Sequence, residues 1–344
     1  MQFIAGSGIR TISLPDSVED LAHGAFQDAV HLEEIVIGKG VTSIPDYAFQ
    51  NCASLKTLIY NDQILRIGNS AFEGCLSLPN DMALPSSLEI LGSRVFAGSS
   101  ITNVIIPDGV KEIAGVFGKT DVASVVLGNG VVEIPSEAFK DCLKLRSIEF
   151  PSGLERIGDS AFLCCPKLKI AKLPDGLKYI GQDAFRGSQI EISELPAALT
   201  EMGKGAFART NIKSIVIPQH VKALPAEVFS NCQQLSKVQI LGVLESIGEA
   251  AFRSCGKLSS VPDKCNVTLL SESIFEDCQS LTEVVIPDAV TEVPAKAFRG
   301  CTALKSVIIH KGVERICDRA FEGCGLKNVV LENKKCRIAR TAFA

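Results

Sequence analysis

Cysteine and histidine are the residues of this 344-residue chain that could do chemistry, and the sequence contains 13 of the first and four of the second. A thiol can form a disulfide, bind zinc or act as a nucleophile, and a nucleophile needs a base such as histidine within hydrogen-bond reach. The histidines, His23, His31, His220 and His310, are spread along the chain, and only the first two could approach each other. Zinc sites use closely spaced pairs of Cys or His, a spacing that does not occur here. We predict no catalytic residue, no metal site and no cofactor.

Most of the cysteines follow a repeat instead. Nine of them lie three residues after a phenylalanine: Cys52, Cys75, Cys142, Cys165, Cys232, Cys255, Cys278, Cys301 and Cys324. Elsewhere the same position holds another small residue: Ala29, Ser99, Thr120, Ser188 or Thr210. A position that accepts these residue types is small and buried, and a free cysteine behaves as a small hydrophobic residue. We therefore interpret the nine as buried structural thiols rather than as a disulfide framework.

The other four cysteines lie outside this position. Cys164 is adjacent to Cys165, Cys317 replaces a glycine of the repeat, and Cys265 and Cys336 fall in irregular stretches. These four are the predicted reactive thiols.

Phenylalanine marks the repeat itself. Sixteen of the 17 phenylalanines recur every 21 to 24 residues, and only Phe150 is out of phase. The series is Phe3, Phe26, Phe49, Phe72, Phe96, Phe117, Phe139, Phe162, Phe185, Phe207, Phe229, Phe252, Phe275, Phe298, Phe321 and Phe343. A repeat this short cannot enclose a core alone, but stacked repeats bury a continuous one. Residues 1–344 are therefore predicted to form a single solenoid domain of about 15 repeats of 22–23 residues.

Each repeat predicts one strand and one turn. In Leu281–Ile286 the apolar residues Leu281, Val284 and Ile286 are typical of a strand with an inward face, and Pro287 ends it. One such strand per repeat builds a parallel sheet, which we place on the concave face. The stretch before each phenylalanine, such as Ile157–Phe162, has Asp or Ser placed to cap a helical turn. Short turns or helical turns are expected on the convex face.

These motifs resemble the BspA-like leucine-rich repeats. The resemblance is carried by Leu-x-x-Ile-x-Ile-Pro, Ile-Gly-x-x-Ala-Phe and Cys-x-x-Leu, as in Ile67–Cys75 and Leu304–Ile309, and it covers essentially the whole chain. It implies a leucine-rich-repeat solenoid, a β-rich horseshoe of the α/β type. It also implies surface-displayed or secreted proteins of host-associated bacteria and anaerobic protists, several of which are adhesins.

Three segments and the two ends depart from the pattern. Val110–Phe117 is one residue short, Leu78–Leu84 has one residue too many, and Val261–Cys265 has no regular strand. We expect kinks or weak strand pairing there. Neither terminus has the polar capping repeat that a solenoid usually needs. We therefore expect a fragment of a longer chain, or ends that are masked by self-association.

Charge and hydropathy restrict the partners. The net charge of −4 comes from 35 basic and 39 acidic residues that are scattered singly, so we predict no nucleic-acid partner. The apolar runs are far shorter than the roughly 20 residues that span a bilayer, so we predict no membrane insertion. The family resemblance predicts a cell-surface or secreted protein. The sequence shows no secretory signal, and 13 thiols suit a reducing compartment, so a cytoplasmic location is the alternative.

A partner surface can be predicted from the strands, because the residue between the two inward positions points outward. In chain order these residues are Val36, Ile59, Ala83, Ile105, Val126, Glu149, Lys172, Glu194, Val216, Gln239, Val285, Ile308 and Val330. All except Ala83 are predicted partner contacts. The column is apolar at both ends, which is typical of a contact site if the residues form one exposed patch. Alternatively, β-branched residues are there because they suit strands.

We predict a non-catalytic protein-binding module, an adhesin-type segment that binds host or cell-surface macromolecules. Self-association through the uncapped ends or the sheet face is a further expectation. The alternatives are a structural spacer that presents another domain, or the recognition part of a larger enzyme.

Overall fold

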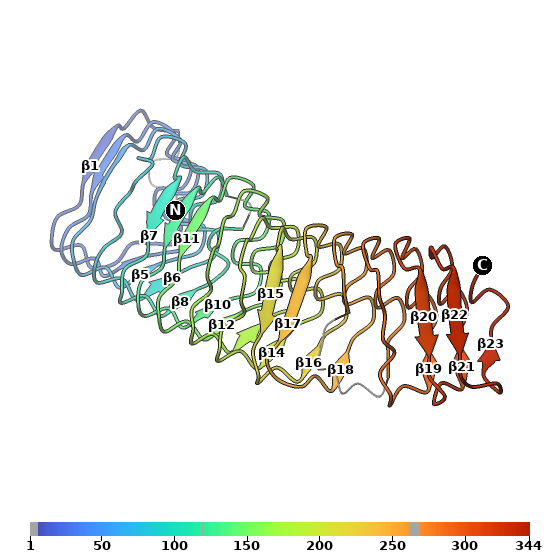
Figure 1. Cartoon of the computed structure of the whole chain (residues 1–344). Coiled ribbons are helices and arrows are strands. Elements are labelled where there is room, and N and C mark those ends of the chain that lie inside the picture. The colour runs from blue at the N-terminus through green and yellow to red at the C-terminus, as the bar shows by residue number, and fades with distance from the viewer. Residues whose placement is uncertain (1–5, 119, 262–268) are drawn as a thin grey trace. The chain divides into compact units, whose positions relative to one another are not determined.

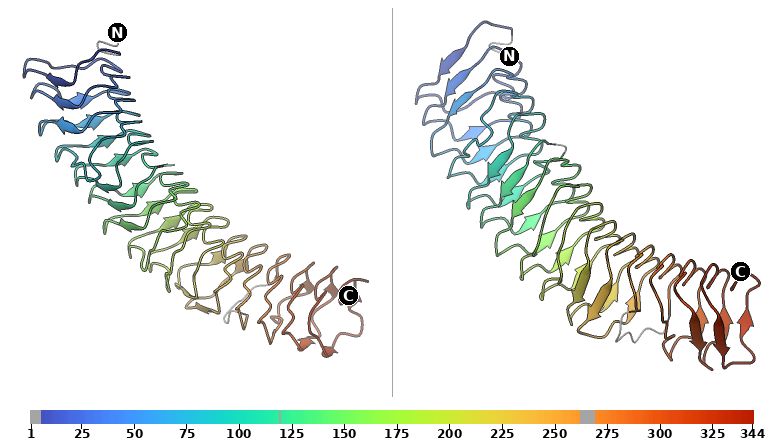
Figure 2. Two further views of the ribbon diagram at one scale, coloured as in Figure 1. Left: turned by 90° about the horizontal axis from the view of Figure 1, so that it is seen from above. Right: turned by 45° about the horizontal axis from the view of Figure 1, so that its top comes forward.

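The computed structural model describes residues 6–118, 120–261 and 269–344. They form a parallel β-solenoid of about 14 turns, which confirms the predicted leucine-rich-repeat fold. The chain divides into two compact units, Met1–Lys169 and Ile170–Ala344, and each is described by itself. Within each unit, equivalent strands of successive coils lie side by side (Figures 1 and 2). The single solenoid domain over residues 1–344 stays a prediction.

The first unit carries two stacks of parallel strands. The longer strands are β1 (Thr11–Ser13), β2 (Glu34–Val36), β4 (Thr57–Ile59), β7 (Asn103–Ile105), β9 (Ser124–Val126) and β11 (Ser147–Glu149). They pair in the orders β1-β2-β4 and β7-β9-β11. The shorter strands are β3 (Ser43–Ile44), β5 (Arg66–Ile67), β6 (Ile90–Leu91), β8 (Glu112–Ile113), β10 (Glu133–Ile134) and β12 (Arg156–Ile157). Of these, β3-β5-β6-β8 form one ladder and β10 pairs with β12.

The second unit repeats this arrangement. Its longer strands are β15 (Ser214–Ile217), β17 (Lys237–Ile240), β20 (Ser306–Ile309) and β22 (Asn328–Leu331), paired β15-β17 and β20-β22. Its shorter strands are β13 (Tyr179–Ile180), β14 (Glu201–Met202), β16 (Ala223–Leu224), β18 (Ser246–Ile247), β19 (Glu292–Val293), β21 (Arg315–Ile316) and β23 (Arg337–Ile338). The sequence predicted one strand per repeat, so the second, two-residue strand is a feature that it missed.

The phenylalanines stack along the core of each unit. Successive rings from Phe26 to Phe162 and from Phe185 to Phe343 lie 5.0–6.3 Å apart, nearly parallel. The phenylalanine rings inside these two series are almost all inaccessible to solvent. Phe150, which is out of phase, instead meets Phe162 edge-on at 6.1 Å. The predicted buried slot for one aromatic residue per coil is confirmed.

The segment around each phenylalanine is a chain of turns, and no residue of the described ranges is in a helix. The reason is a pair of left-handed residues, two before and two after the phenylalanine. At Phe229 these are Glu227 (φ 57°) and Asn231 (φ 60°). A residue in this conformation cannot continue a right-handed helix. Of the two expected forms, short turns are therefore the one observed.

These turns bind each coil to the next through the backbone. The N–H groups of Glu227, Phe229 and Asn231 donate to carbonyls of the following coil at 2.7–2.9 Å. The N–H groups of the two residues between them donate within their own coil, as that of Ser230 does to the Glu227 carbonyl at 2.9 Å. Successive amides thus alternate between hydrogen bonds to the following coil and hydrogen bonds within their own coil. This satisfies buried backbone donors that would otherwise carry a free-energy cost.

The predicted irregularities have different outcomes. Leu78–Leu84 contains no strand, and the longer-strand order is interrupted there between β4 and β7, which confirms weak pairing. Val110–Phe117 keeps strand β8, paired with β6, so its shortening leaves this pairing intact. Of Val261–Cys265, only Val261 lies within the described residues.

Removal of one stacked ring should destabilise the fold strongly. Phe252 has no exposed surface and lies between Phe229 and Phe275, with ring centroids 5.8 and 5.6 Å away. We expect Phe252→Ala to lower the free energy of unfolding by about 3–5 kcal/mol, as for other buried aromatics. Urea denaturation measures this. Phe150→Ala is the control with the smaller effect, and a loss under about 1 kcal/mol at Phe252 contradicts the stacked core.

Candidate functional site

The outward side chains of the longer strands form a surface that we call the strand face. In the first unit, Val36 on β2 is in register with Ile59 on β4, and Ile105, Val126 and Glu149 are in register on β7, β9 and β11. None of these five side chains is buried, and Ile59 and Ile105 are 50% and 67% exposed. Their predicted outward orientation is confirmed. Their role in binding stays a prediction.

A hollow of about 370 Å³ interrupts the strand face of the first unit. It is lined by Asp81, Met82, Ala83, Leu84, Ser86, Asn103, Ile105 and Pro107. The hollow occupies the strandless segment Leu78–Leu84, beside β7. Most of the lining is apolar, and Ile105 forms part of it. The extra residue in Leu78–Leu84 was the sequence signal for this feature, although it predicted only weak pairing.

In the second unit the strand face has two parts. Glu194, Val216 and Gln239 are in register through β15, β17 and an isolated bridge. Val285, Ile308 and Val330 are in register through β20, β22 and another bridge, and Val285 and Ile308 are 80% and 59% exposed. Lys172 is exposed but lies outside any strand. All seven side chains are therefore exposed or half-buried.

The repeated cysteine position has a specific hydrogen-bonding role. In all nine cases the thiol Sγ donates to the carbonyl oxygen of the phenylalanine in the preceding coil, at 2.8–3.2 Å. Where Ser99, Thr120 or Thr210 takes this place, its hydroxyl donates to the phenylalanine carbonyl of its own coil at 2.7–2.8 Å. The position is buried in eight of the nine cysteine coils and half-buried at Cys324. The predicted structural burial is thus confirmed, with a donor role added.

Burial also makes the fully buried thiols at this position poor nucleophiles. It raises the pKa of Cys52 and Cys278 to about 12 and that of Cys232 to about 11. The thiolate is the nucleophilic form, so little of it is present at neutral pH. None of the cysteines in the described part of the chain forms a disulfide.

The predicted reactive thiols differ among themselves. Cys164 is exposed, whereas Cys317 and Cys336 are half-buried. Burial and the neighbouring Glu292, whose Oε1 accepts a hydrogen bond from the thiol at 3.2 Å, raise the pKa of Cys317 to about 11. Cys265 lies outside the described residues. Cys164 is therefore the one of this group with a freely accessible side chain.

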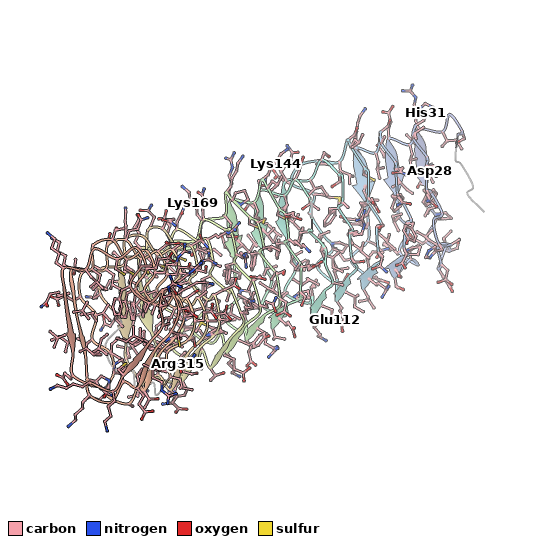
Figure 3. The ribbon with its side chains drawn as sticks, turned by 90° about the vertical axis from the view of Figure 1, so that its right-hand side faces the viewer. Asp28, His31, Glu112, Lys144, Lys169 and Arg315 are labelled. Carbon is pink, nitrogen blue, oxygen red and sulfur yellow. The ribbon has the colours of Figure 1, made fainter. Side chains whose placement is uncertain are left out.

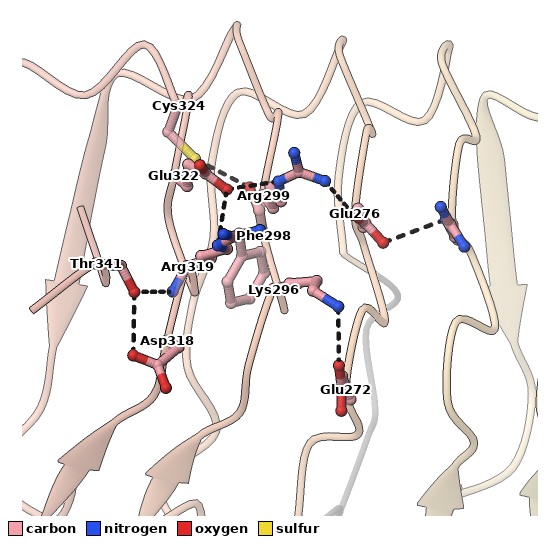
Figure 4. Close-up of polar contacts among 11 residues, drawn as sticks. Glu272, Glu276, Lys296, Phe298, Arg299, Asp318, Arg319, Glu322, Cys324 and Thr341 are labelled. Carbon is pink, nitrogen blue, oxygen red and sulfur yellow. Dashed lines mark hydrogen bonds and ion pairs between the residues drawn. The ribbon is translucent and has the colours of Figure 1, made fainter. Parts of the chain in front are cut away.

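A row of alternating charges crosses four coils of the second unit (Figure 4). Arg253 contacts Glu276 at 3.2 Å, Arg299 contacts Glu276 at 2.9 Å and Glu322 at 2.6 Å. The Glu276 side chain is only 3% exposed. Burial alone would raise its pKa, but hydrogen bonds from Arg299 and Ser273 and the charges of Arg253 and Arg299 together lower it below the ordinary 4.5. Glu276 is therefore an ionised, fully partnered carboxylate, and its role is to hold coils together.

Other charges are dispersed. In the first unit, Lys144 and Glu112 point away from the ribbon on different sides (Figure 3). Lys144 pairs with Asp121 in the preceding coil at 2.7 Å. Among the described residues, no group of three or more His, Cys, Asp or Glu side chains is placed to hold a metal ion. In the same residues no helix is long and apolar enough to cross a membrane.

Comparison with known proteins assigns the fold to a family. The model of the "BspA type Leucine rich repeat region" matches residues 2–116, 114–236 and 222–344. The chain belongs to the BspA-type leucine-rich-repeat family. No curated protein sequence matches it.

The chain is also similar to solved leucine-rich-repeat structures. A leucine-rich-repeat protein from Bacteroides ovatus is 27% identical, with 93% of this chain and 92% of that chain covered and a TM-score of 0.74. A leucine-rich cell surface protein from Faecalibacterium prausnitzii is 22% identical, with 98% and 90% covered and a TM-score of 0.43. BspA-type repeats are generally non-enzymatic scaffolds for protein interactions.

The two thiol environments should be distinguishable by alkylation. At about pH 8 we expect iodoacetamide to modify Cys164 of the folded chain first, because it is exposed. The eight buried repeat thiols should react only after unfolding, since burial makes them inaccessible to the reagent. Peptide mass mapping over time measures both rates. Modification of Cys52 or Cys232 as fast as Cys164 would contradict the buried hydrogen-bonded position.

The charge row predicts a pH-dependent effect on stability. The pKa of Glu276 is lower in the folded state, so its contribution is present above the ordinary value of 4.5 and is lost as pH falls through the folded value. At pH 7 we expect Glu276→Gln to lower the free energy of unfolding by about 1–3 kcal/mol. The difference from the natural chain should shrink under acid. Denaturation at several pH values measures it.

Glu272→Gln is the matched control, because Glu272 forms a single exposed ion pair with Lys296 at 3.3 Å. Exposed pairs contribute about 0–1 kcal/mol. Equal effects of the two substitutions at all pH values would refute the special role of Glu276.

Proposed function

We propose that this chain is a non-catalytic protein-binding module that contacts its partner through the strand face, with residues 1–344 acting as one solenoid domain. The observation that carries the proposal is the exposure of large apolar side chains there. Ile105 and Val285 are 67% and 80% exposed, although both lie in paired strand positions. Val126 lies beside Ile105, and Ile308 lies beside Val285, so each unit has its own apolar surface there. Contiguous exposed apolar surface marks interaction sites in soluble proteins.

The shape of the first-unit hollow supports protein rather than small-molecule binding. It is an open depression beside Ile105 with Met82, Leu84 and Pro107 in its lining. An apolar side chain of a partner would fill it while the surrounding strand residues contact the partner's main chain. Such a central buried anchor with a polar rim is typical of protein interfaces.

The finer part of the proposal is an adhesin-type role in a cell-surface or secreted protein that binds host or cell-surface macromolecules. Its support is the family, whose members are typically surface-displayed or secreted. A pre-formed repeat surface suits this role because little conformational entropy is lost when it binds.

A pull-down with strand-face variants tests the proposal. The pair Ile105→Lys and Val285→Lys adds charge to the exposed column without touching the core. We expect captured host-surface protein to fall about tenfold, since a buried apolar contact is replaced by a desolvated charge. Unchanged thermal unfolding should accompany the loss.

Val132→Lys and Leu143→Lys form the matched control pair. These side chains are also exposed, at 54% and 58%, but lie outside the strand face. Equal loss with both pairs would contradict the assigned face. Absence of any partner for the natural chain would favour the spacer function.

A further inference from the structure

Two consecutive coils carry a shifted form of the strand motif. In Leu145–Phe150 the apolar residues stand at the first, fourth and sixth positions. In Leu168–Leu173 and Ile190–Leu195 they stand at the first, third and sixth. Ile170 and Ile192 fill the core, with 5% and 1% exposed.

The shift prevents regular strand formation. The fourth-position residues, Ala171 and Ser193, are exposed instead of buried. A one-residue change of alternation turns side chains to the opposite face of a strand. Residues 170–195 contain none of the longer strands. Among them, only Glu194 still pairs at the equivalent position, through an isolated bridge to Val216.

A hollow of about 150 Å³ lies at this interruption of the strand face. It is lined by Lys172, Leu173, Asp175, Glu194, Leu195, Pro196, Ala197, Val216, Pro218 and Leu241. Seven of these ten residues are apolar. Leu173 and Leu195 are themselves buried, whereas Leu241 is 52% exposed. The volume suits one side chain and is well below that of a pocket for a drug-sized ligand, about 300–1,000 Å³.

The charges around the hollow favour a cation. The Lys172 ammonium pairs with the Asp175 carboxylate at 3.0 Å, so these two charges compensate each other. Glu194 is exposed and forms no ion pair within the described residues of this unit. The lining therefore has an apolar surface and one uncompensated carboxylate.

We propose that this hollow binds an arginine side chain from an extended segment of a partner protein. The three methylenes of arginine cover apolar surface while its head stays polar. The planar guanidinium can donate two parallel hydrogen bonds to the Glu194 carboxylate, a geometry that the ammonium of lysine cannot match. The proposal rests on the protein-binding function of the strand face, and it names the chemistry that the partner presents there.

The test uses the full chain and a capped pentapeptide, acetyl-Gly-Ala-Arg-Ala-Gly-amide, at millimolar concentration. Methyl NMR of Val216 and Leu241 reports occupancy of the hollow. We expect saturable shifts at both residues. The peptide with citrulline, which has the shape of arginine without its charge, should bind about tenfold more weakly or worse.

Glu194→Gln in the protein should weaken binding of the arginine peptide by about the same factor. Glu191→Gln is the matched control, because Glu191 is an exposed glutamate of the same coil that does not line the hollow. Binding that is absent, that is equal for arginine and citrulline, or that survives Glu194→Gln overturns the proposal.

The two proposals can fail separately. Partner capture that is lost with the Ile105 and Val285 substitutions but unaffected by Glu194→Gln overturns the arginine site alone. If the arginine peptide binds at Val216 but no partner protein is captured, the arginine site stands and the protein-binding function is overturned.

Discussion

The stacking of one coil on the next is the constraint on which the rest of the structure depends. A coil of 22–23 residues cannot bury its own phenylalanine or satisfy its own turn amides. The following coil supplies both, as Ala251 accepts from the Phe229 amide and Phe252 covers the Phe229 ring. The cysteine thiol adds a third contact, directed to the phenylalanine carbonyl of the preceding coil. None of these three contacts involves the side chains of the outward strand residues.

Much of this arrangement could be predicted because each structural position recurs in many repeats of the sequence. The phenylalanine series predicted the stacked core, and the Cys, Ala, Ser and Thr alternation predicted a small buried position. The two-residue strands, such as Arg156–Ile157, were missed because they are too short to show an alternating pattern. The left-handed turns were missed because residues such as Glu227 and Lys296, unlike glycine, carry no sequence signal for a positive φ.

The candidate site was predicted only in part, for a related reason. Outward positions follow from alternation, so Ile105 and Val285 could be placed from the motif. The two hollows on the strand face arise where the motif fails, at Leu78–Leu84 and at Ile190–Leu195. Their form depends on how an inserted or shifted residue is accommodated by the neighbouring coils. In this chain the regular coils form the continuous stack, and the irregular coils form the two hollows.

Backbone hydrogen exchange of the full chain, read residue by residue, tests the stacking account most directly. The account predicts that the amides of Glu227, Phe229 and Asn231, which donate to the following coil, are strongly protected and exchange together in one cooperative opening. Their partners in the next coil should open with them. Exchange of these amides at the rate of solvent-exposed loops, or independently of one another, would contradict the dependence of each coil on its neighbour.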